Sequence, residues 1–227
     1  MPVVSFCSSK GGVSKSTSAT LLATQLTARG ASVTVIDADP NRPIARWAKK
    51  PGKPDNLTVI ADVTEETLID VIEASARLTA FVIVDLEGTA NLMVAQAMSR
   101  SDLVVIPTRG SALDAIEAFK AVKFIHFQEK NYRSKIPFAV LFTQTSAAIR
   151  PKTLTSIEAE FAADGVPIFN VQIHDRDAYR ALFTFGGTLD TLDTKQVRNI
   201  PAAVENAKAF TGEVIRMLDA IRARAVA

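Results

Sequence analysis

Short apolar runs alternate with amphipathic stretches along the 227-residue chain. Several runs are almost continuous, such as FVIV at 81–84 and LVVI at 103–106, which is typical of strands buried on both faces of a parallel sheet. We expect strands at Val3–Ser8, Ser32–Asp37, Leu57–Ala61, Phe81–Asp85, Leu103–Pro107, Phe138–Thr143 and Pro167–Ile173. Apolar residues at helical spacing predict helices at Ser16–Arg29, Glu65–Arg77, Ala90–Ser99, Leu113–Gln128, Lys152–Ala163 and Asp177–Thr184.

A last helix is expected at about Ala202–Arg224, where apolar residues form a stripe. The less periodic stretch before it, Phe185–Asn199, is expected to be a loop. Alternation of strands and helices predicts an α/β fold: a doubly wound, mostly parallel sheet with helices on both faces. We expect one domain over residues 1–227, with the last helix packed on it.

Composition excludes several classes of protein. Lys and Arg number 26 and Asp and Glu 24, a formal net charge of +2, which argues against a polycation and an acidic disordered chain. The single cysteine, Cys7, excludes an intramolecular disulfide framework and a Cys-rich metal site, and the presence of only two histidines argues against a His-based metal site. No apolar run approaches the roughly 20 residues of a membrane span, and no secretion signal is visible. We therefore expect a cytoplasmic protein without stable membrane insertion.

The most informative segment is KGGVSKST at 10–17, between the first strand and the first helix. Glycines let several backbone N–H groups point at one anion, and the helix adds its positive N-terminal end. Lys15 can reach the β- and γ-phosphates of a nucleotide, and the Ser16 hydroxyl is placed to ligate Mg²⁺. The segment predicts a site for ATP and Mg²⁺, with nucleotide contacts from Gly11, Gly12, Val13, Ser14, Lys15, Ser16 and Thr17.

The loop departs from the general pattern G-x-x-x-x-G-K-[ST], since Ser9 and Ser14 replace its two glycines and Lys10 lies inside it. In this form, K-G-G-x-x-K-[ST]-T, it resembles the deviant Walker A motif of the ParA/MinD ATPases. The resemblance extends over most of the chain and is to the small ParA/ParF type. It implies that Lys10 is catalytic and reaches the partner's phosphates in a nucleotide-sandwich homodimer. The family usually has Gly where Ser14 stands, so we expect binding to survive if serine can adopt the backbone conformation required there.

Acidic residues follow two of the expected strands. Asp37 and Asp39 end one strand and share one side of an extended chain, which would also suit the capping of a surface turn. Asp85 ends FVIV, where ligands bind in open α/β sheets. The resemblance implies that Asp39 positions the attacking water, that Asp37 supports the metal shell or the loop, and that Ser16, Asp39 and Asp85 serve the Mg²⁺ ion.

Later segments also match the family. Asp114 matches an aspartate near the dimer interface of relatives, although a helix N-terminus by itself favours an aspartate. Thr143 and Gln144 lie where relatives place a residue that contacts the adenine base. Arg176 and Tyr179 match a segment at the nucleotide edge or the interface.

The resemblance implies an ATPase, weak alone and stimulated by a ParB-like partner, that segregates plasmid or chromosomal DNA. Residues 195–227 hold six basic and three acidic side chains, a net charge of +3. Dimerisation would double this charge and could create a face for non-specific DNA binding, so the ATP-bound protein would associate with the nucleoid.

Other functions remain open at this stage. One is a positioning ATPase whose cargo is a protein cluster. RPxxRW at Arg42–Trp47 and HDRDAY at 174–179 also resemble the VirC-type protein of T-DNA transfer, a conjugation accessory. A small-molecule ligase of the dethiobiotin synthetase kind shares the fold, but Lys10 argues against it. Ser14 leaves room for a scaffold that binds ATP without hydrolysing it.

Overall fold

The structure, a computed structural model, describes residues 1–88 and 91–226, with side chains described as far as residue 224. Its centre is a seven-stranded sheet in the order β3-β2-β4-β1-β5-β6-β7, and every pairing is parallel. The strands are β1 (Val3–Phe6), β2 (Val33–Ala38), β3 (Leu57–Ile60), β4 (Phe81–Leu86), β5 (Leu103–Arg109), β6 (Phe138–Thr145) and β7 (Ile173–His174). The predicted fold class is confirmed.

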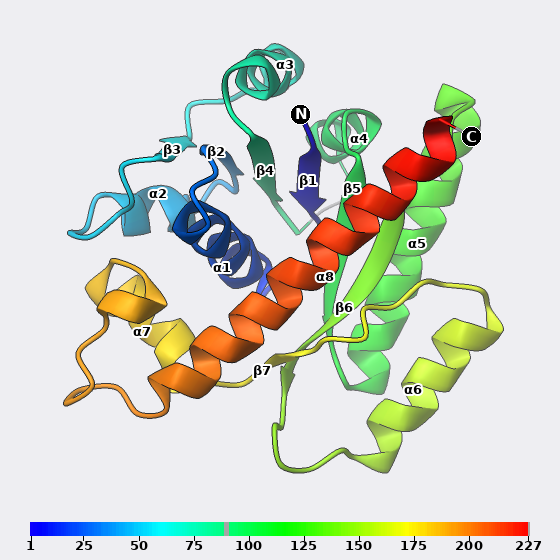
Figure 1. The fold of residues 1–227 in the computed structure, drawn as a ribbon. Coiled ribbons are helices and arrows are strands. Elements are labelled where there is room, and N and C mark those ends of the chain that lie inside the picture. Colours follow the sequence, from blue (N-terminus) through cyan, green and yellow to red (C-terminus); the bar gives the residue numbers. More distant parts are fainter. Residues whose placement is uncertain (89–90, 227) are drawn as a thin grey trace.

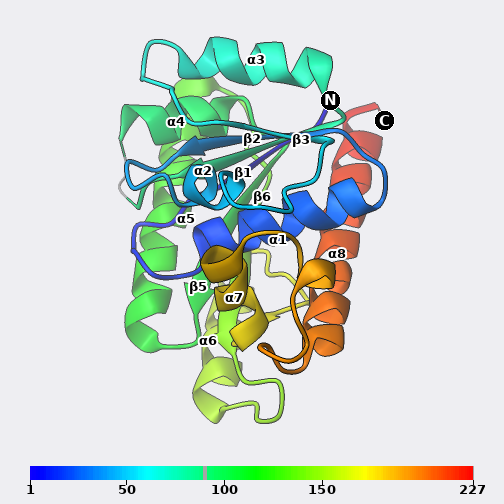
Figure 2. The same ribbon diagram turned by 90° about the vertical axis from the view of Figure 1, so that its left-hand side faces the viewer.

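Helices cover both faces of the sheet (Figures 1 and 2). They are α1 (Lys15–Ala28), α2 (Pro43–Ala48), α3 (Leu68–Leu78), α4 (Leu92–Ser99), α5 (Ala112–Tyr132), α6 (Lys152–Ala163), α7 (Asp177–Phe185) and α8 (Ile200–Val226). Helices α1, α2, α7 and α8 share one apolar core with the sheet, and α3, α4, α5 and α6 share the other. Neighbouring residues of a strand enter opposite cores, as Val104 and Val105 of β5 do, because successive side chains of a strand point to opposite faces.

Most predicted elements agree with the structure to within a few residues, but the strand expected at Pro167–Ile173 is wrong. Ile168 forms only an isolated bridge with Val140, and β7 holds two residues. Between them, the backbone N–H groups of Asn170 and Val171 donate to the carboxylate of Glu213 on α8, each at 2.8 Å. A side chain from a distant helix thus takes the place of a neighbouring strand.

The stretch expected to be a loop between α7 and α8 contains a 3-10 turn at Leu189–Thr191. Its apolar residues Leu189, Leu192 and Val197 are buried. The indole N–H of Trp47 on α2, a six-residue helix that the sequence pattern did not indicate, donates to the carbonyl of Gly187 at 3.1 Å. The stretch therefore closes one end of the core beside α2.

The helix expected to begin at Ala90 cannot be compared at its start, because Ala90 lies outside the described residues. Helix α4 runs from Leu92, after Asn91, whose side chain accepts a hydrogen bond from the Val94 N–H at 2.9 Å. In the part of the chain that the structure describes, no helix is both long enough and apolar enough to cross a membrane.

The sheet brings the predicted functional segments to one edge. Parallel strands end on the same side, so the loop after β1 and the ends of β2 and β4 meet there. Asp37 and Asp85 are direct partners in the register of β2 and β4, and Phe6, at the end of β1, pairs with Asp85.

Candidate nucleotide-binding site

The loop between β1 and α1 turns tightly at two residues that have left-handed backbone conformations. Gly12 has φ +74°. Ser14, just before the first turn of α1, has φ 63° and ψ 30°, which lies in the small left-handed region open to non-glycine residues at a cost of about 1–2 kcal/mol. Serine thus adopts a left-handed conformation at the position where the family usually has glycine.

A cleft of about 980 Å³ opens beside this loop. Its lining includes most of the predicted nucleotide-binding residues, together with Asp39: Gly11, Gly12, Ser14, Lys15, Ser16, Thr17 and Gln144. Lys15 is 7% exposed, so its ammonium group is held within the loop. A cleft lined by backbone amides and a lysine at a helix N-terminus is suited to a polyphosphate.

Asp85 lies beneath the loop, with no exposed surface. Neither carboxylate oxygen has a hydrogen-bond partner among the described residues. Burial raises the pKa of Asp85 to about 7, and the nearby Ser16 hydroxyl and Lys15 ammonium oppose this rise only in part. A buried carboxylate without a partner is costly.

These features fit a magnesium site. The described residues contain no group of three or more His, Cys, Asp or Glu side chains that could hold a metal ion alone. Mg²⁺ typically takes one or two carboxylates, a hydroxyl, waters and phosphate oxygens. Asp85 and Ser16 would supply the protein's share, and the cation would satisfy the unpaired carboxylate.

The two aspartates after β2 have different surroundings. Asp37 is buried and accepts a hydrogen bond from the Ala45 N–H on α2 at 2.8 Å. Burial raises the pKa of Asp37, and backbone N–H groups oppose the rise. Asp39 lines the cleft and accepts from the Asn41 N–H at 2.8 Å. Asp39 is therefore accessible to a cleft ligand, whereas Asp37 supports the turn into α2.

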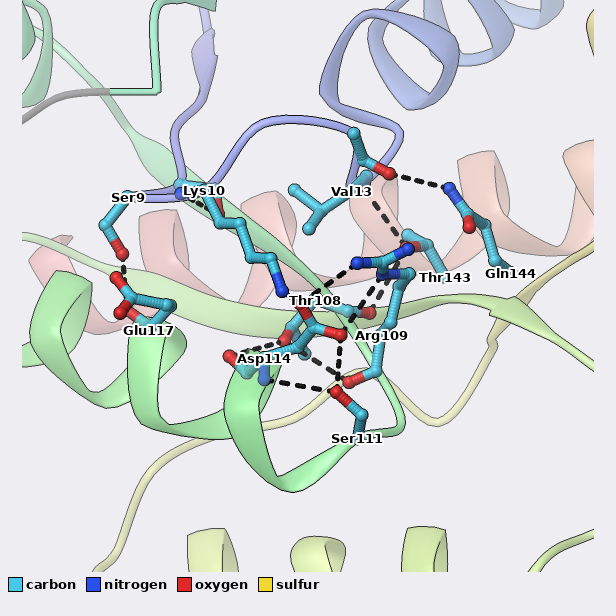
Figure 3. A network of polar contacts seen from close by, with 12 residues as sticks. Ser9, Lys10, Val13, Thr108, Arg109, Ser111, Asp114, Glu117, Thr143 and Gln144 are labelled. Atoms are coloured by element: carbon cyan, nitrogen blue, oxygen red, sulfur yellow. Dashed lines mark hydrogen bonds and ion pairs between the residues drawn. The ribbon is translucent and has the colours of Figure 1, made fainter.

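Lys10 does not line the cleft but points away to α5 (Figure 3). Its Nζ lies 2.5 Å from Oδ1 of Asp114 in the same chain. Arg109 and Ser111 also contact this carboxylate, with the Ser111 hydroxyl donating at 2.6 Å. Burial would raise the pKa of Asp114, but the contacts from Lys10, Ser111 and Arg109 lower it. The aspartate singled out from the sequence is thus the cis partner of Lys10.

Thr143 and Gln144, at the end of β6, contact the loop itself. The Thr143 hydroxyl donates to the Val13 carbonyl at 3.0 Å, and the Gln144 amide donates to the Gly12 carbonyl at 2.8 Å. Thr143 and Val13 are both buried and outside the cleft lining. Base contact by Thr143 or Gln144 stays a prediction.

The far wall of the cleft comes from β7 and α7. It includes the predicted Arg176 and Tyr179, and also residues that the sequence reasoning missed: Ile173, His174, Asp175, Arg180 and Phe183. The spacing of 176, 179, 180 and 183 is that of one helix face, which was the available signal. The pKa of His174 is lowered, first by burial and then by Arg176.

The amino-acid sequence is similar to those of known proteins over nearly its whole length. The model of the VirC1 protein family matches residues 1–220. The protein ParA of Rhizobium radiobacter is 44% identical over 218 residues, which cover 96% of this chain and 98% of that protein.

Solved structures share the fold. Cyanthece apo McdA has a TM-score of 0.72 at 18% identity, covering 91% of this chain and 99% of that one. A Borrelia burgdorferi B31 plasmid partition protein bound to AMPPNP has a TM-score of 0.69 at 16% identity, covering 95% and 98%. The chain therefore belongs to the VirC1 family and has the ParA/MinD-type fold that its phosphate loop indicated.

Proposed function

We propose that this chain is a ParA-type ATPase that binds ATP and Mg²⁺ at the cleft beside residues 10–17. The observation that carries the proposal is the meeting of the loop, Asp39 and the unpartnered Asp85 at the ends of adjacent strands. The AMPPNP-bound relative supports a nucleotide as the ligand class.

The residues divide the work of phosphoryl transfer. The loop amides and Lys15 would hold the phosphates, and Ser16 and Asp85 would hold Mg²⁺, which would neutralise phosphate charge. Asp39, exposed to the cleft, orients the attacking water. Positioning and charge stabilisation carry most of the rate in this reaction, so no further covalent group is required.

Dimerisation would complete the site. Lys10 is bound to Asp114 in the isolated chain, and it would leave this carboxylate to reach the phosphates of a second copy. Arg109 and Ser111 would still contact Asp114, so the aspartate would keep partners after Lys10 leaves.

The dimer would bind DNA non-specifically through the basic side chains of the C-terminal region. Of the three acidic residues at 195–227, Glu213 is buried and bound to backbone amides. The exposed surface of α8 is therefore more basic than the sequence count suggests. Hydrolysis, stimulated by a ParB-like partner, would reset a cytoplasmic protein that associates with the nucleoid when ATP is bound. The proposed role is segregation of plasmid or chromosomal DNA.

Two variants separate binding from hydrolysis. Lys15→Ala should weaken ATP binding beyond detection at micromolar nucleotide, because the buried ammonium is lost. Asp39→Ala should retain ATP binding and ATP-dependent dimers but lose turnover. Equilibrium binding, light scattering and phosphate release measure the three properties. Micromolar ATP binding by Lys15→Ala would overturn the site, and unchanged hydrolysis by Asp39→Ala would remove Asp39 from the mechanism.

Two other roles of the same site have specific support. The family match over 1–220 favours a VirC-like accessory role in conjugation or T-DNA transfer. The 27% identity over 194 residues to a maintenance of carboxysome distribution protein A favours a positioning ATPase for a protein cluster. The neighbouring genes distinguish the cargoes: a small DNA-binding protein indicates partition, and transfer genes indicate conjugation.

A further inference from the structure

Two consecutive side chains at the end of β6 donate hydrogen bonds to the loop at residues 10–17. In a regular strand, Thr143 and Gln144 would point to opposite faces. Here the register shifts between Thr143 and Thr145, and Gln144 has φ 54°. This irregularity turns the Gln144 side chain so that both residues contact the loop (Figure 3).

The contacts fall on two successive peptide units of the loop. The Gln144 amide donates to the Gly12 carbonyl at 2.8 Å. The Thr143 hydroxyl donates to the Val13 carbonyl at 3.0 Å, which is nearer than its alternative acceptor, the Thr108 carbonyl, at 3.2 Å. In a trans peptide, the carbonyl and the following N–H point in opposite directions. Drawing both carbonyls toward β6 therefore turns the N–H groups of Val13 and Ser14 away from β6. Amides of such loops are the groups that cradle phosphates.

The same amide of Gln144 also contacts Ser14, the residue that stands where the family usually has glycine. Its Nε2 lies 2.9 Å from the Ser14 hydroxyl oxygen. Glycine would offer no such atom, and it populates the left-handed region freely. The left-handed backbone of Ser14 is strained by comparison, and the Gln144 contact is placed to offset part of that cost.

We propose that Thr143 and Gln144 are positioning residues that orient the loop amides for phosphate binding, with Gln144 offsetting the strain of Ser14. This role differs from the adenine contact expected from the sequence. It rests on the proposed nucleotide site, but its first consequence, a rigid loop, belongs to the free protein.

The decisive comparison uses Gln144→Ala with ATP and GTP. Since the loop serves the phosphates, both nucleotides should bind about three- to tenfold more weakly, the effect of one or two modest hydrogen bonds. Adding Ser14→Gly should make the Gln144→Ala effect smaller, because glycine adopts the left-handed conformation unaided and only the contact with the Gly12 carbonyl is then lost. Such non-additivity is expected of residues in direct contact.

Thr143 offers an isosteric test in the same strand. Thr143→Val removes the donor without changing volume and should weaken both nucleotides several-fold, whereas Thr143→Ser, which keeps the hydroxyl, should restore affinity. Arg133→Gly is the matched control for backbone strain. It relieves a left-handed residue (φ 52°) at the end of α5, and it should leave nucleotide affinity unchanged.

Hydrogen exchange of the backbone amides of residues 12–15, measured without nucleotide, directly tests whether Thr143 and Gln144 hold the loop rigid. Gln144→Ala should exchange faster there than the native chain, with the sheet unaffected. Equal exchange, unchanged affinity, or a loss confined to ATP that alters the ATP-to-GTP ratio would each overturn the inference, the last in favour of base contact. Failure of the native chain to bind any nucleotide would instead contradict the proposed function, and faster loop exchange would still support this positioning role.

Discussion

Lys10 and Asp114 form an ion pair inside one chain, and this pair competes with the trans contact proposed for Lys10. Asp114 is 3% exposed and Lys10 is about one-third exposed. A partly exposed pair is typically worth at most about 1 kcal/mol. The cis contact is therefore strong enough to bias Lys10 in the monomer and weak enough to be exchanged on dimerisation.

Asp114→Asn should tighten ATP-dependent dimerisation by up to about thirtyfold, because Lys10 in each of the two chains loses a charged competitor worth at most about 1 kcal/mol. Analytical ultracentrifugation with ATP measures the dimer constant. Glu160→Gln, at an exposed position of α6, is the control for the loss of one carboxylate. Weaker or unchanged dimerisation of Asp114→Asn would mean that the cis pair does not restrain Lys10.

At the scale of elements, α8 is held to the sheet partly by a buried carboxylate. Glu213 on α8 is 4% exposed and accepts hydrogen bonds from the backbone of Asn170 and Val171. These bonds explain why the apolar run before β7 does not form the full strand that its pattern predicts. The preference of a segment is thus overridden by a partner about forty residues away in the chain.

Glu213→Gln should lower the free energy of unfolding by about 1–3 kcal/mol, the cost of leaving a buried donor poorly satisfied. The neutral amide keeps one acceptor oxygen, but it directs N–H groups at one of the backbone donors. Urea titration followed by circular dichroism measures the change. Glu205→Gln, at an exposed position of the same helix, should remain within about 0.5 kcal/mol of the native chain. Equal stability of the two variants would show that Glu213 does not anchor α8.

At the scale of the whole molecule, exposed cations lie on the side of the sheet that α8 covers. On the α8 side, Lys208 and Arg216 are exposed, and Arg29 at the end of α1 donates to the Lys208 carbonyl at 3.3 Å. Three cations from two elements therefore lie on the face proposed to bind DNA. Such a surface is weak in one chain and is doubled in a dimer.

Changing Lys208 and Arg216 together to Glu should reduce ATP-dependent DNA retention at least tenfold at low salt. The slope of log affinity against log salt should fall by about two per chain, since each lost phosphate contact contributes about one. Filter binding across salt concentrations measures both, and ATP hydrolysis without DNA should not change. Lys130→Glu, on α5 across the sheet, is the control. Equal losses from both variants would indicate a general charge effect rather than a defined face.

The sequence by itself determined the parallel α/β fold and the nucleotide loop. Apolar periodicity reports burial along each segment, and the glycine and lysine pattern of residues 10–17 carries its chemistry locally. The placement of Asp39 and Asp85 beside this loop could also be predicted from the sequence, because the carboxyl ends of neighbouring strands lie at the same edge of a parallel sheet. Only the tertiary structure decided that Lys10 pairs with Asp114, that Glu213 interrupts β7, and that Gln144 grips the loop. Each of these depends on side chains brought together from distant segments, and neither local propensity nor spacing encodes such encounters.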